Sequence, residues 1–270
     1  MDRYPRMKLI LEDGAEFDGV SFGAPSPVVG EVVFTTAMSG YVEALTDPSF
    51  RGQILVLTYP LAGNYGVPPA RRAGTIDGPF ESDRIQVLGL VVQHAIAHPS
   101  HHASTRTLGQ WLASEGIPAV TGIDTRSLTR RLREHGTMRG WLLPAERPLD
   151  DERRAAQSVD MRRELFRLVA IEAPIKYGNG PGPHVLLVDV GVKDNITRSL
   201  LKRGATVTRA PWHADLGALA NDADGVLIGN GPGDPKDLLE LVEQVRGLLQ
   251  RPGLPIFGIC MGHQILGLAA

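Results

Sequence analysis

Leu254-Pro-Ile-Phe-Gly-Ile-Cys260-Met-Gly-His-Gln-Ile-Leu-Gly-Leu-Ala-Ala270 is the segment that is most informative about the fold of the carboxyl-terminal part of this sequence. Its first half, Pro255 to Ile259, is a short apolar run bounded by turn-forming residues, which indicates a buried strand. Its second half has an apolar face at helical spacing from Gln264 to Leu268, which predicts a helix that begins near Gly262. The single cysteine of the chain therefore lies at a strand-to-helix turn.

Cys260 is flanked two residues away by Gly258 and Gly262, the spacing of a nucleophile elbow. Such a sharp turn crowds the backbone, so only glycine is comfortable at the flanking positions. The turn would lift the sulfur out of the sheet edge, favour thiolate at a helix N-terminus, and aim the N–H of Met261 at an oxyanion. The alternative is a buried structural cysteine that ends a core strand. The glycine spacing favours the nucleophile.

The residues from 184 onward alternate between short apolar strands and helices. We expect strands at 184–190, 205–209, 225–229 and 255–259, and helices at 194–203, 216–220 and 235–250. This alternation is typical of an α/β domain with a doubly wound, mostly parallel sheet. In such sheets ligands bind at the carboxyl ends of the strands. Cys260 and the loop Asn230-Gly-Pro-Gly-Asp-Pro235 both follow strand ends, so they should meet there.

The amino-terminal part predicts a mixed β/α domain over residues 1–145. Asp13-Gly14 suits a type I′ hairpin between strands at 8–12 and 15–20. Further strands are expected at 31–36, 54–57, 87–93 and 138–143, and a helix at 108–116. Asp124 is a plausible N-cap of another helix that runs to His135, with its arginines on a solvated face. Residues 150–170 are charged and helical in character, and the Gly- and Pro-rich residues 174–183 that follow them indicate a linker, so we expect a linker region at 146–183 and a second domain at 184–270.

Composition narrows the class of protein. The 270 residues suffice for two domains, and a net charge of −2 gives no support for nucleic-acid or polybasic membrane binding. One cysteine excludes an intrachain disulfide, and no apolar run approaches the ~20 residues that a membrane span needs. The histidines at 98, 101 and 102 lack acidic or cysteine partners at ligand spacing, so no metal site is expected. We expect a cytoplasmic protein.

The segment Gly258-Ile-Cys260-Met-Gly-His-Gln264 resembles the nucleophile motif of class I glutamine amidotransferases. The resemblance implies that Cys260 attacks the side-chain amide of glutamine and releases ammonia. In that family the histidine and glutamate of the triad lie well downstream of the cysteine. We therefore expect an amino-terminal part of a longer protein, inactive by itself. His263 is a poor candidate for the base, because one turn into the helix it should face away from the sulfur.

The loop Asn230 to Pro235 could supply the second half of the catalytic site. A tetrahedral intermediate needs two donors that converge on its oxyanion. The N–H of Met261 is one candidate, and the N–H of Gly231 is the natural second. Gly233 could let the backbone approach the α-amino and carboxylate end of the substrate. The alternative is a tight βα turn without a binding role.

The first domain carries a second resemblance. The segments 30–49 (Gly-Glu-Val-Val-Phe-Thr-Thr-Ala-Met-Ser-Gly-Tyr-Val-Glu-Ala-Leu-Thr-Asp-Pro-Ser), 57–60 (Leu-Thr-Tyr-Pro) and 63–66 (Gly-Asn-Tyr-Gly) are similar to the carbamoyl-phosphate synthase small-subunit family. Asp124 to Arg130, Asp189 to Asn195 and Asn230 to Pro235 continue the match. The family likeness implies a glutaminase that delivers ammonia to a large, ATP-dependent synthetase subunit in arginine and pyrimidine biosynthesis. ATP, magnesium and bicarbonate belong to that large subunit, and no cofactor is expected in this chain.

By position, the resemblance implies a role for six residues. Cys260 is the nucleophile, Gly231 and Met261 supply oxyanion N–H groups, and Ser49, Gly233 and Gln264 contact glutamine. Ser49 would reach the site from the other domain. Two other functions stay open: a non-catalytic module that docks the synthetase subunit, and another class I thiol amidohydrolase, for example one that acts on γ-glutamyl peptides.

Overall fold

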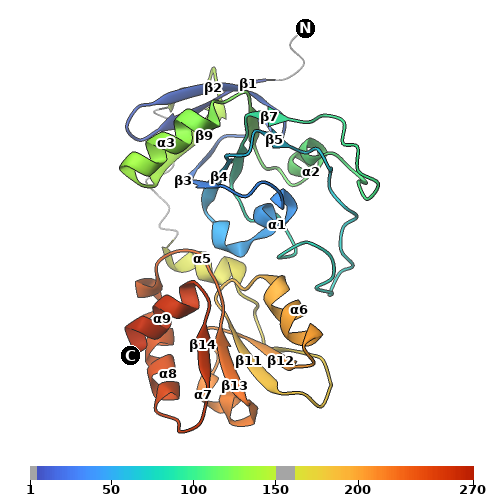
Figure 1. Ribbon diagram of the computed structural model, residues 1–270. Helices are drawn as coiled ribbons and strands as arrows, with labels where there is room; N and C mark the ends of the chain where they lie inside the picture. The colour runs from blue at the N-terminus through green and yellow to red at the C-terminus, as the bar shows by residue number, and fades with distance from the viewer. Residues whose placement is uncertain (1–4, 150–161) are drawn as a thin grey trace. The chain divides into compact units, whose positions relative to one another are not determined.

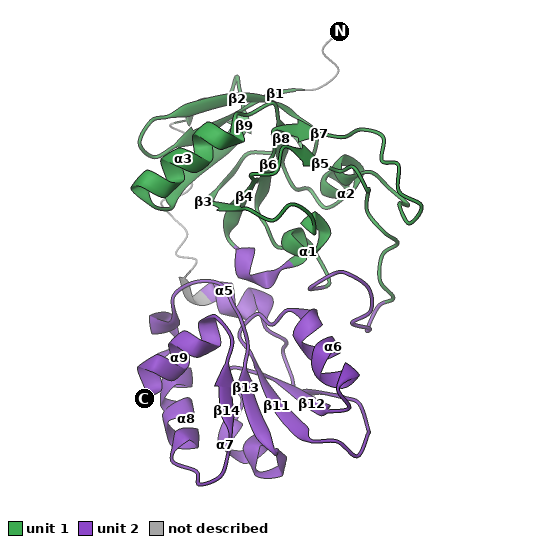
Figure 2. Cartoon of the chain, viewed as in Figure 1, with its two compact units in different colours: residues 1–46, 52–72, 83–159 green, residues 47–51, 73–82, 160–270 purple. Residues whose placement is uncertain are grey.

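A computed structural model describes residues 5–149 and 162–270, and the chain divides into two compact units (Figure 2). The first unit comprises residues 1–46, 52–72 and 83–159, and the second comprises 47–51, 73–82 and 160–270. Two short segments from the amino-terminal half, 47–51 and 73–82, are therefore part of the second unit.

The first unit is built on a closed barrel of seven strands. In spatial order these are β1 (Arg6–Leu11), β2 (Glu16–Ser21), β8 (Ala119–Thr121), β6 (Gly89–Val91), β4 (Gln53–Leu57), β3 (Val28–Thr35) and β9 (Met138–Pro144), which pairs again with β1. Met7, Leu9 and Leu11 alternate along β1 into one apolar core with Val32 and Ile54. A closed sheet leaves no free edge strand in the barrel.

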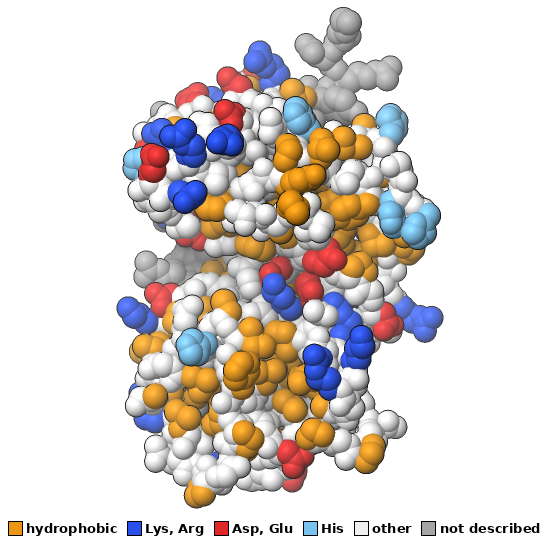
Figure 3. Space-filling model, viewed as in Figure 1, with side chains coloured by type: hydrophobic (Ala, Val, Ile, Leu, Met, Phe, Trp, Pro, Cys, Tyr) orange, Lys and Arg blue, Asp and Glu red, His pale blue; other side chains and the backbone are white. Residues whose placement is uncertain are grey.

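Helices α1 (Tyr41–Thr46), α2 (Leu108–Ser114) and α3 (Thr125–His135) belong to this unit (Figure 1), as do the short paired strands β5 (Leu61–Ala62) and β7 (His94–Ala95). The prediction for α3 is confirmed: Asp124 Oδ1 accepts a hydrogen bond from Ser127 N at 2.9 Å, and Leu128 and Leu132 are buried. Basic side chains gather over α3 (Figure 3), where Arg126, Arg130 and Arg133 are exposed.

The hairpin between β1 and β2 is present, but its expected type I′ turn is wrong. A type I′ turn needs positive φ at both central residues, and among the described residues Cys260 is the only non-glycine with positive φ. Instead, Leu11 N donates to Ala15 O at 2.9 Å, and only Gly14, with φ 87°, is left-handed. Asp13 Oδ1 accepts from Ala15 N at 3.0 Å, which stabilises this longer turn.

The second unit contains a five-stranded sheet. Its order is β10 (Ile175–Tyr177), β12 (Thr206–Pro211), β11 (His184–Asp189), β13 (Gly225–Ile228) and β14 (Ile256–Gly258). The last four strands are parallel, and β10 is antiparallel to β12. The expected α/β fold class is confirmed. β10 lies within the segment that the sequence indicated as a linker, and adds an edge strand to the sheet.

Helices cover both faces of this sheet (Figure 1). They are α5 (Arg162–Val169), α6 (Asp194–Lys202), α7 (Leu216–Leu219), α8 (Leu239–Leu249) and α9 (Met261–Ala269), with 3₁₀ turns η1 (Pro48–Phe50), η2 (Ala220–Asp222) and η3 (Pro235–Leu238). Leu186 and Val188 of β11 share one core with residues of α8 and α9, whereas Leu187 packs with residues of α6. This two-sided burial follows from the alternation of side chains along a strand.

Residues 5–149 and 162–270 contain neither a membrane-crossing helix nor a cluster of metal-ligating side chains. None of these helices combines the length and the apolar character that a bilayer crossing requires. No group of three or more His, Cys, Asp or Glu side chains in the same residues could hold a metal ion.

Replacement of Asp124 by alanine should lower the free energy of unfolding by about 1 kcal/mol, because it removes the side-chain acceptor at the N-terminus of α3. Urea denaturation followed by circular dichroism measures this difference. Asp124→Asn is the matched control and should stay close to the wild type, since its side-chain oxygen can still accept from Ser127 N. Equal stability of Asp124→Ala and the wild type would contradict the capping role.

Candidate active site

The backbone at Cys260 is strained. Its φ of 53° and ψ of −108° make it the only described non-glycine residue with positive φ. Such a conformation costs about 1–3 kcal/mol and persists only where the surrounding structure imposes it. Cys260 is a free and exposed cysteine between β14 and α9. The alternative of a buried structural cysteine is therefore wrong.

Close packing explains the two glycines that flank Cys260. A Cβ atom on Gly262 would lie 2.1 Å from the carbonyl oxygen of Ile228. A Cβ atom on Gly258 would lie 2.4 Å from the carbonyl carbon of Gly262. Both clashes are with backbone atoms, which cannot rotate away as a side chain could. The prediction that only glycine fits at these positions is confirmed.

Backbone hydrogen bonds fix the elbow to the end of β13. Gly262 N donates to Gly229 O at 3.0 Å, and Ile259 N donates to Ile228 O at 2.9 Å. The loop that begins at Asn230 follows directly. The elbow and this loop are therefore neighbours at the carboxyl end of the parallel sheet, as the strand–helix alternation predicted.

Three backbone N–H groups near the elbow have no acceptor. Within the described part of the chain, the N–H groups of Gly231, Gly233 and Met261 donate no hydrogen bond. Gly231 and Met261 are buried, where backbone donors without an acceptor are rare. Glycine is required at both loop positions: a Cβ atom on Gly231 would lie 2.2 Å from Val190 O, and Gly233 has a φ of 78°.

Asn230 joins three segments of the second unit. Its side chain is 3% exposed. Its Oδ1 accepts from Lys193 N at 3.0 Å, and its Nδ2 donates to Gly191 O at 3.0 Å and to Ser49 Oγ at 2.9 Å. The sequence pattern places Asn230 in the loop but indicates no role for its side chain. An asparagine at a strand end before Gly-Pro-Gly is the signal that could have suggested one.

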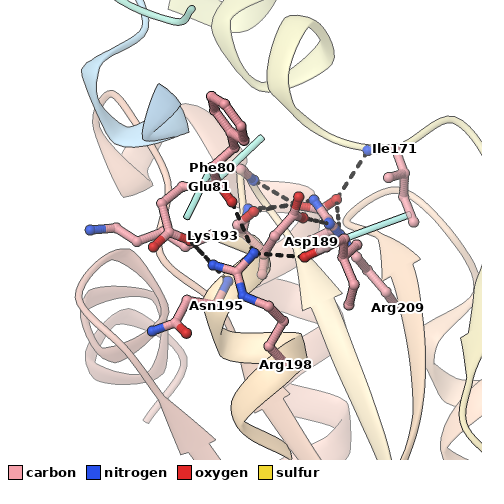
Figure 4. A network of polar contacts seen from close by, with 12 residues as sticks. Phe80, Glu81, Ile171, Asp189, Lys193, Asn195, Arg198 and Arg209 are labelled. Carbon is pink, nitrogen blue, oxygen red and sulfur yellow. Dashed lines mark hydrogen bonds and ion pairs between the residues drawn. The ribbon is translucent and has the colours of Figure 1, made fainter. Parts of the chain in front are cut away.

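A buried ionic network lies beneath the loop that follows β11 (Figure 4). Asp189 Oδ1 accepts from Gly191 N at 2.9 Å and Val192 N at 2.8 Å, while its Oδ2 accepts from Arg209 Nε at 2.8 Å. Arg209 Nη1 also donates to Asp194 Oδ1 at 2.8 Å. Burial opposes the charge of Arg209, but the two carboxylates outweigh it and raise the pKa of the guanidinium. This network fixes the backbone on which Asn230 depends.

The segment 73–82 is anchored on α6 (Figure 4). Glu81 Oε2 accepts from Asn195 N at 2.9 Å and from Arg198 Nη2 at 3.4 Å. Arg198 Nη1 donates to the carbonyl oxygens of Ile76, at 2.8 Å, and Phe80, at 2.9 Å. The N-cap residue of α6, Lys193, makes no side-chain capping bond, so Glu81 supplies this acceptor from a distant segment. Burial is the largest cause that raises the pKa of Glu81, and the N–H of Asn195 and the charge of Arg198 oppose it.

The other predicted site residues occupy definite positions. Ser49 lies in η1, within the second unit, and contacts Asn230. Asp47, two residues earlier, pairs with Lys193 Nζ at 2.7 Å. Gln264 is exposed in the first turn of α9. His263 is also exposed, and its ring makes no hydrogen bond to the Cys260 thiol within the described residues.

Each of the two units overlaps a match to a known protein family. Residues 186–270, which include the elbow and most of the parallel sheet, match the family model described as "Glutamine amidotransferase class-I". Residues 9–142 match the model described as "Carbamoyl-phosphate synthase small chain, CPSase domain". The chain belongs to the carbamoyl-phosphate synthase small chain family, a conclusion that its curated relatives support.

The chain is 49% identical over 269 residues to the carbamoyl phosphate synthase small chain of Symbiobacterium thermophilum, covering 96% of this chain and 71% of that protein. It is 44% identical to the arginine-specific small chain of Neosartorya fischeri, covering 99% of this chain and 59% of that protein. The corresponding protein of Aspergillus niger is 45% identical, with 98% and 58% covered. The chain thus spans somewhat over half the length of these fungal relatives.

Gly262→Ala should destabilise the second unit and reduce the reactivity of Cys260, because its methyl group would meet the Ile228 carbonyl. Gly267→Ala is the matched control on the same helix, where a Cβ atom would meet nothing within 4 Å. It should keep the reactivity of the thiol and raise the stability of α9 by up to about 1 kcal/mol. Thermal unfolding and the rate of reaction with iodoacetamide measure the two effects. Equal behaviour of the two variants would contradict the steric explanation.

The raised pKa of Glu81 predicts a pH dependence of stability. Above its unfolded pKa, near 4.5, the unfolded state loses this proton more readily than the folded state, so the free energy of unfolding falls as pH rises through the folded pKa. Glu81→Gln has no titrating group at position 81, but its side-chain oxygen can still accept the hydrogen bond from Asn195 N. The stability of the wild type relative to Glu81→Gln should therefore fall as pH rises above 4.5, as urea titrations at a series of pH values can show. A difference that rises over this range would contradict the direction of the shift.

Proposed function

We propose that this chain forms the glutaminase part of a glutamine-hydrolysing carbamoyl-phosphate synthase. The observation that carries the proposal is the exposed Cys260, held at positive φ beside a loop in which the N–H groups of Gly231 and Gly233 donate to no acceptor among the described residues. The membership of the chain in the small chain family supports the same function. In this proposal the chain hydrolyses glutamine through a thioester and delivers ammonia to a large, ATP-dependent synthetase subunit.

The chemistry starts at the sulfur of Cys260. The thiolate attacks the side-chain amide carbon of glutamine, a C–S bond forms, and the carbonyl oxygen becomes an oxyanion. The N–H groups of Gly231 and Met261 stabilise this charge, and each such donor is typically worth ~10²–10³ in rate. The C–N bond then breaks, and the nitrogen leaves as ammonia after it gains a proton. Water hydrolyses the thioester to glutamate and restores the thiol.

Recognition of glutamine is assigned to Ser49, Gly233 and Gln264. Gly233 has no side chain and is exposed, so the backbone there is open to a ligand. Ser49 is half-buried beside Asn230, and Gln264 is exposed one turn after the nucleophile. These groups are suited to fix the polar ends of a small amino acid while the amide faces the sulfur.

The remaining parts of the reaction lie outside this chain in our proposal. The resemblance places the triad histidine and glutamate well downstream of the cysteine, so residues 1–270 alone should turn over glutamine negligibly. ATP, magnesium and bicarbonate would be used by the large subunit, and this chain would need no cofactor. The product, carbamoyl phosphate, would serve cytoplasmic arginine and pyrimidine biosynthesis, and the fungal relatives carry the name "arginine-specific".

The test is alkylation of Cys260 by a glutamine analogue that carries an electrophilic carbon in place of the amide. We expect this analogue to label Cys260 faster than a model thiol, because the site binds its amino-acid end. Mass spectrometry measures the label, free glutamine should slow it, and Cys260→Ser should abolish it.

Two outcomes would contradict parts of the proposal. Robust glutamine turnover by residues 1–270 would contradict the downstream base. Unselective labelling, together with binding of a synthetase subunit by Cys260→Ser in native mass spectrometry, would favour a non-catalytic docking module. Selective hydrolysis of γ-glutamyl peptides would favour another class I thiol amidohydrolase.

A further inference from the structure

We propose that Asn230 is a positioning residue that fixes the Ser49 hydroxyl as a hydrogen-bond donor toward an oxygen of the glutamine substrate. This inference rests on the proposed function, and it specifies that Ser49 is the donor in its hydrogen bond to the substrate. It assigns Ser49 to a carboxylate or carbonyl oxygen of the substrate rather than to its α-ammonium group.

Two backbone contacts determine the orientation of the Asn230 amide. Lys193 N–H can only donate, so the atom 3.0 Å from it must be the side-chain oxygen. Gly191 C=O can only accept, so the atom 3.0 Å from it must be the side-chain nitrogen. A flipped amide would place donor against donor and acceptor against acceptor in a buried site. These two contacts therefore permit only one orientation of the Asn230 amide.

This orientation decides the role of the Ser49 hydroxyl. The Asn230 nitrogen lies 2.9 Å from Ser49 Oγ and cannot accept a hydrogen bond, so Ser49 Oγ accepts from it. A hydroxyl has one proton, and within the described residues the Ser49 hydroxyl donates it to no acceptor. Since the proton cannot be given to Asn230, it is available for a ligand acceptor.

The segment that carries Ser49 is held on the same loop. Asp47 Oδ1 accepts from Ser49 N at 3.0 Å, and Asp47 Oδ2 pairs with Lys193 Nζ at 2.7 Å. Asp47 is 5% exposed, so its carboxylate is largely shielded from water, whereas the Lys193 side chain is 39% exposed. Ser49 is thus fixed through both its backbone and its hydroxyl before a ligand arrives. A group that is already ordered loses less conformational freedom on binding.

Asn230→Asp distinguishes two roles of this side chain: orienting the Ser49 hydroxyl proton, or only linking Ser49 to the loop. The substitution keeps the shape of the side chain and an acceptor for Lys193 N. It replaces the nitrogen beside Ser49 with an oxygen, which can accept the hydroxyl proton. The substrate would then lose its donor although Ser49 is still present. Asn221→Asp is the matched control, since Asn221 is exposed in the same unit and accepts from Arg251 through its side-chain oxygen.

The measured quantity is the selectivity ratio, defined as the rate constant of Cys260 alkylation by the glutamine analogue divided by that for iodoacetamide. Damage to the elbow slows both reagents and largely cancels in this ratio, whereas loss of substrate recognition lowers it. We expect Ser49→Ala and Asn230→Asp each to lower the ratio at least about tenfold, a change of ~1.4 kcal/mol. The double variant should be no lower than either single variant, and Asn221→Asp should match the wild type.

Each other outcome has a definite meaning. A wild-type ratio for Asn230→Asp, or additive effects in the double variant, would overturn the inference and leave the proposed function standing. A wild-type ratio for Ser49→Ala would remove Ser49 from glutamine recognition, and the inference with it. Absence of selectivity in the wild-type chain would overturn the proposed function itself.

Circular dichroism and thermal unfolding check that each variant folds. If Asn230→Asp does not fold, Asn230→Ala takes its place. It removes the donor without supplying an acceptor, so the ratio should fall by less than in Ser49→Ala. In Asn230→Ala the Ser49 hydroxyl can still donate to the substrate. Adding Ser49→Ala to this variant should therefore lower the ratio further. No further decrease, or a wild-type ratio for Asn230→Ala, would overturn the inference.

Discussion

A contact between backbone atoms holds the candidate site together. Helix α9 begins so close to the Ile228 carbonyl that position 262 has no space for a side chain. This contact forces the strained turn at Cys260, with the thiol outside the sheet. Met261 and Ile265 are buried in the same core as β13, so apolar packing offsets the strain. Because β13 ends where the Asn230 loop begins, the same contact places nucleophile and loop side by side.

Buried polar groups keep the loops in place. Loops have few apolar contacts, and in a medium of low dielectric a satisfied hydrogen bond is strong while an unsatisfied one is costly. Asp189 uses one oxygen for two backbone N–H groups and the other for Arg209. Asn230 continues this network toward Ser49. Donors that are fixed in advance need no reorganisation when charge develops on a substrate, which is the main requirement of an oxyanion site.

The second unit uses residues from far away in the sequence. Segment 47–51 supplies Ser49 and Asp47, and segment 73–82 supplies Glu81, which caps α6. The hydrogen bond between Ser49 and Asn230 joins residues that are 181 positions apart. The second unit in its folded form therefore includes pieces of the amino-terminal half of the chain. This arrangement is the physical reason why Ser49 lies beside the Asn230 loop.

The elbow, the parallel sheet and the capped helix α3 could be predicted from the sequence, because glycine spacing, hydrophobic periodicity and N-caps act over a few residues. The closed barrel, the turn at Asp13, the cap from Glu81 and the orientation of Asn230 could not. Those features depend on which distant groups meet: strand pairing in the barrel, and the backbone partners of Asn230 at Gly191 and Lys193. Local periodicity carries no information about such distant partners, which are brought together when the chain folds.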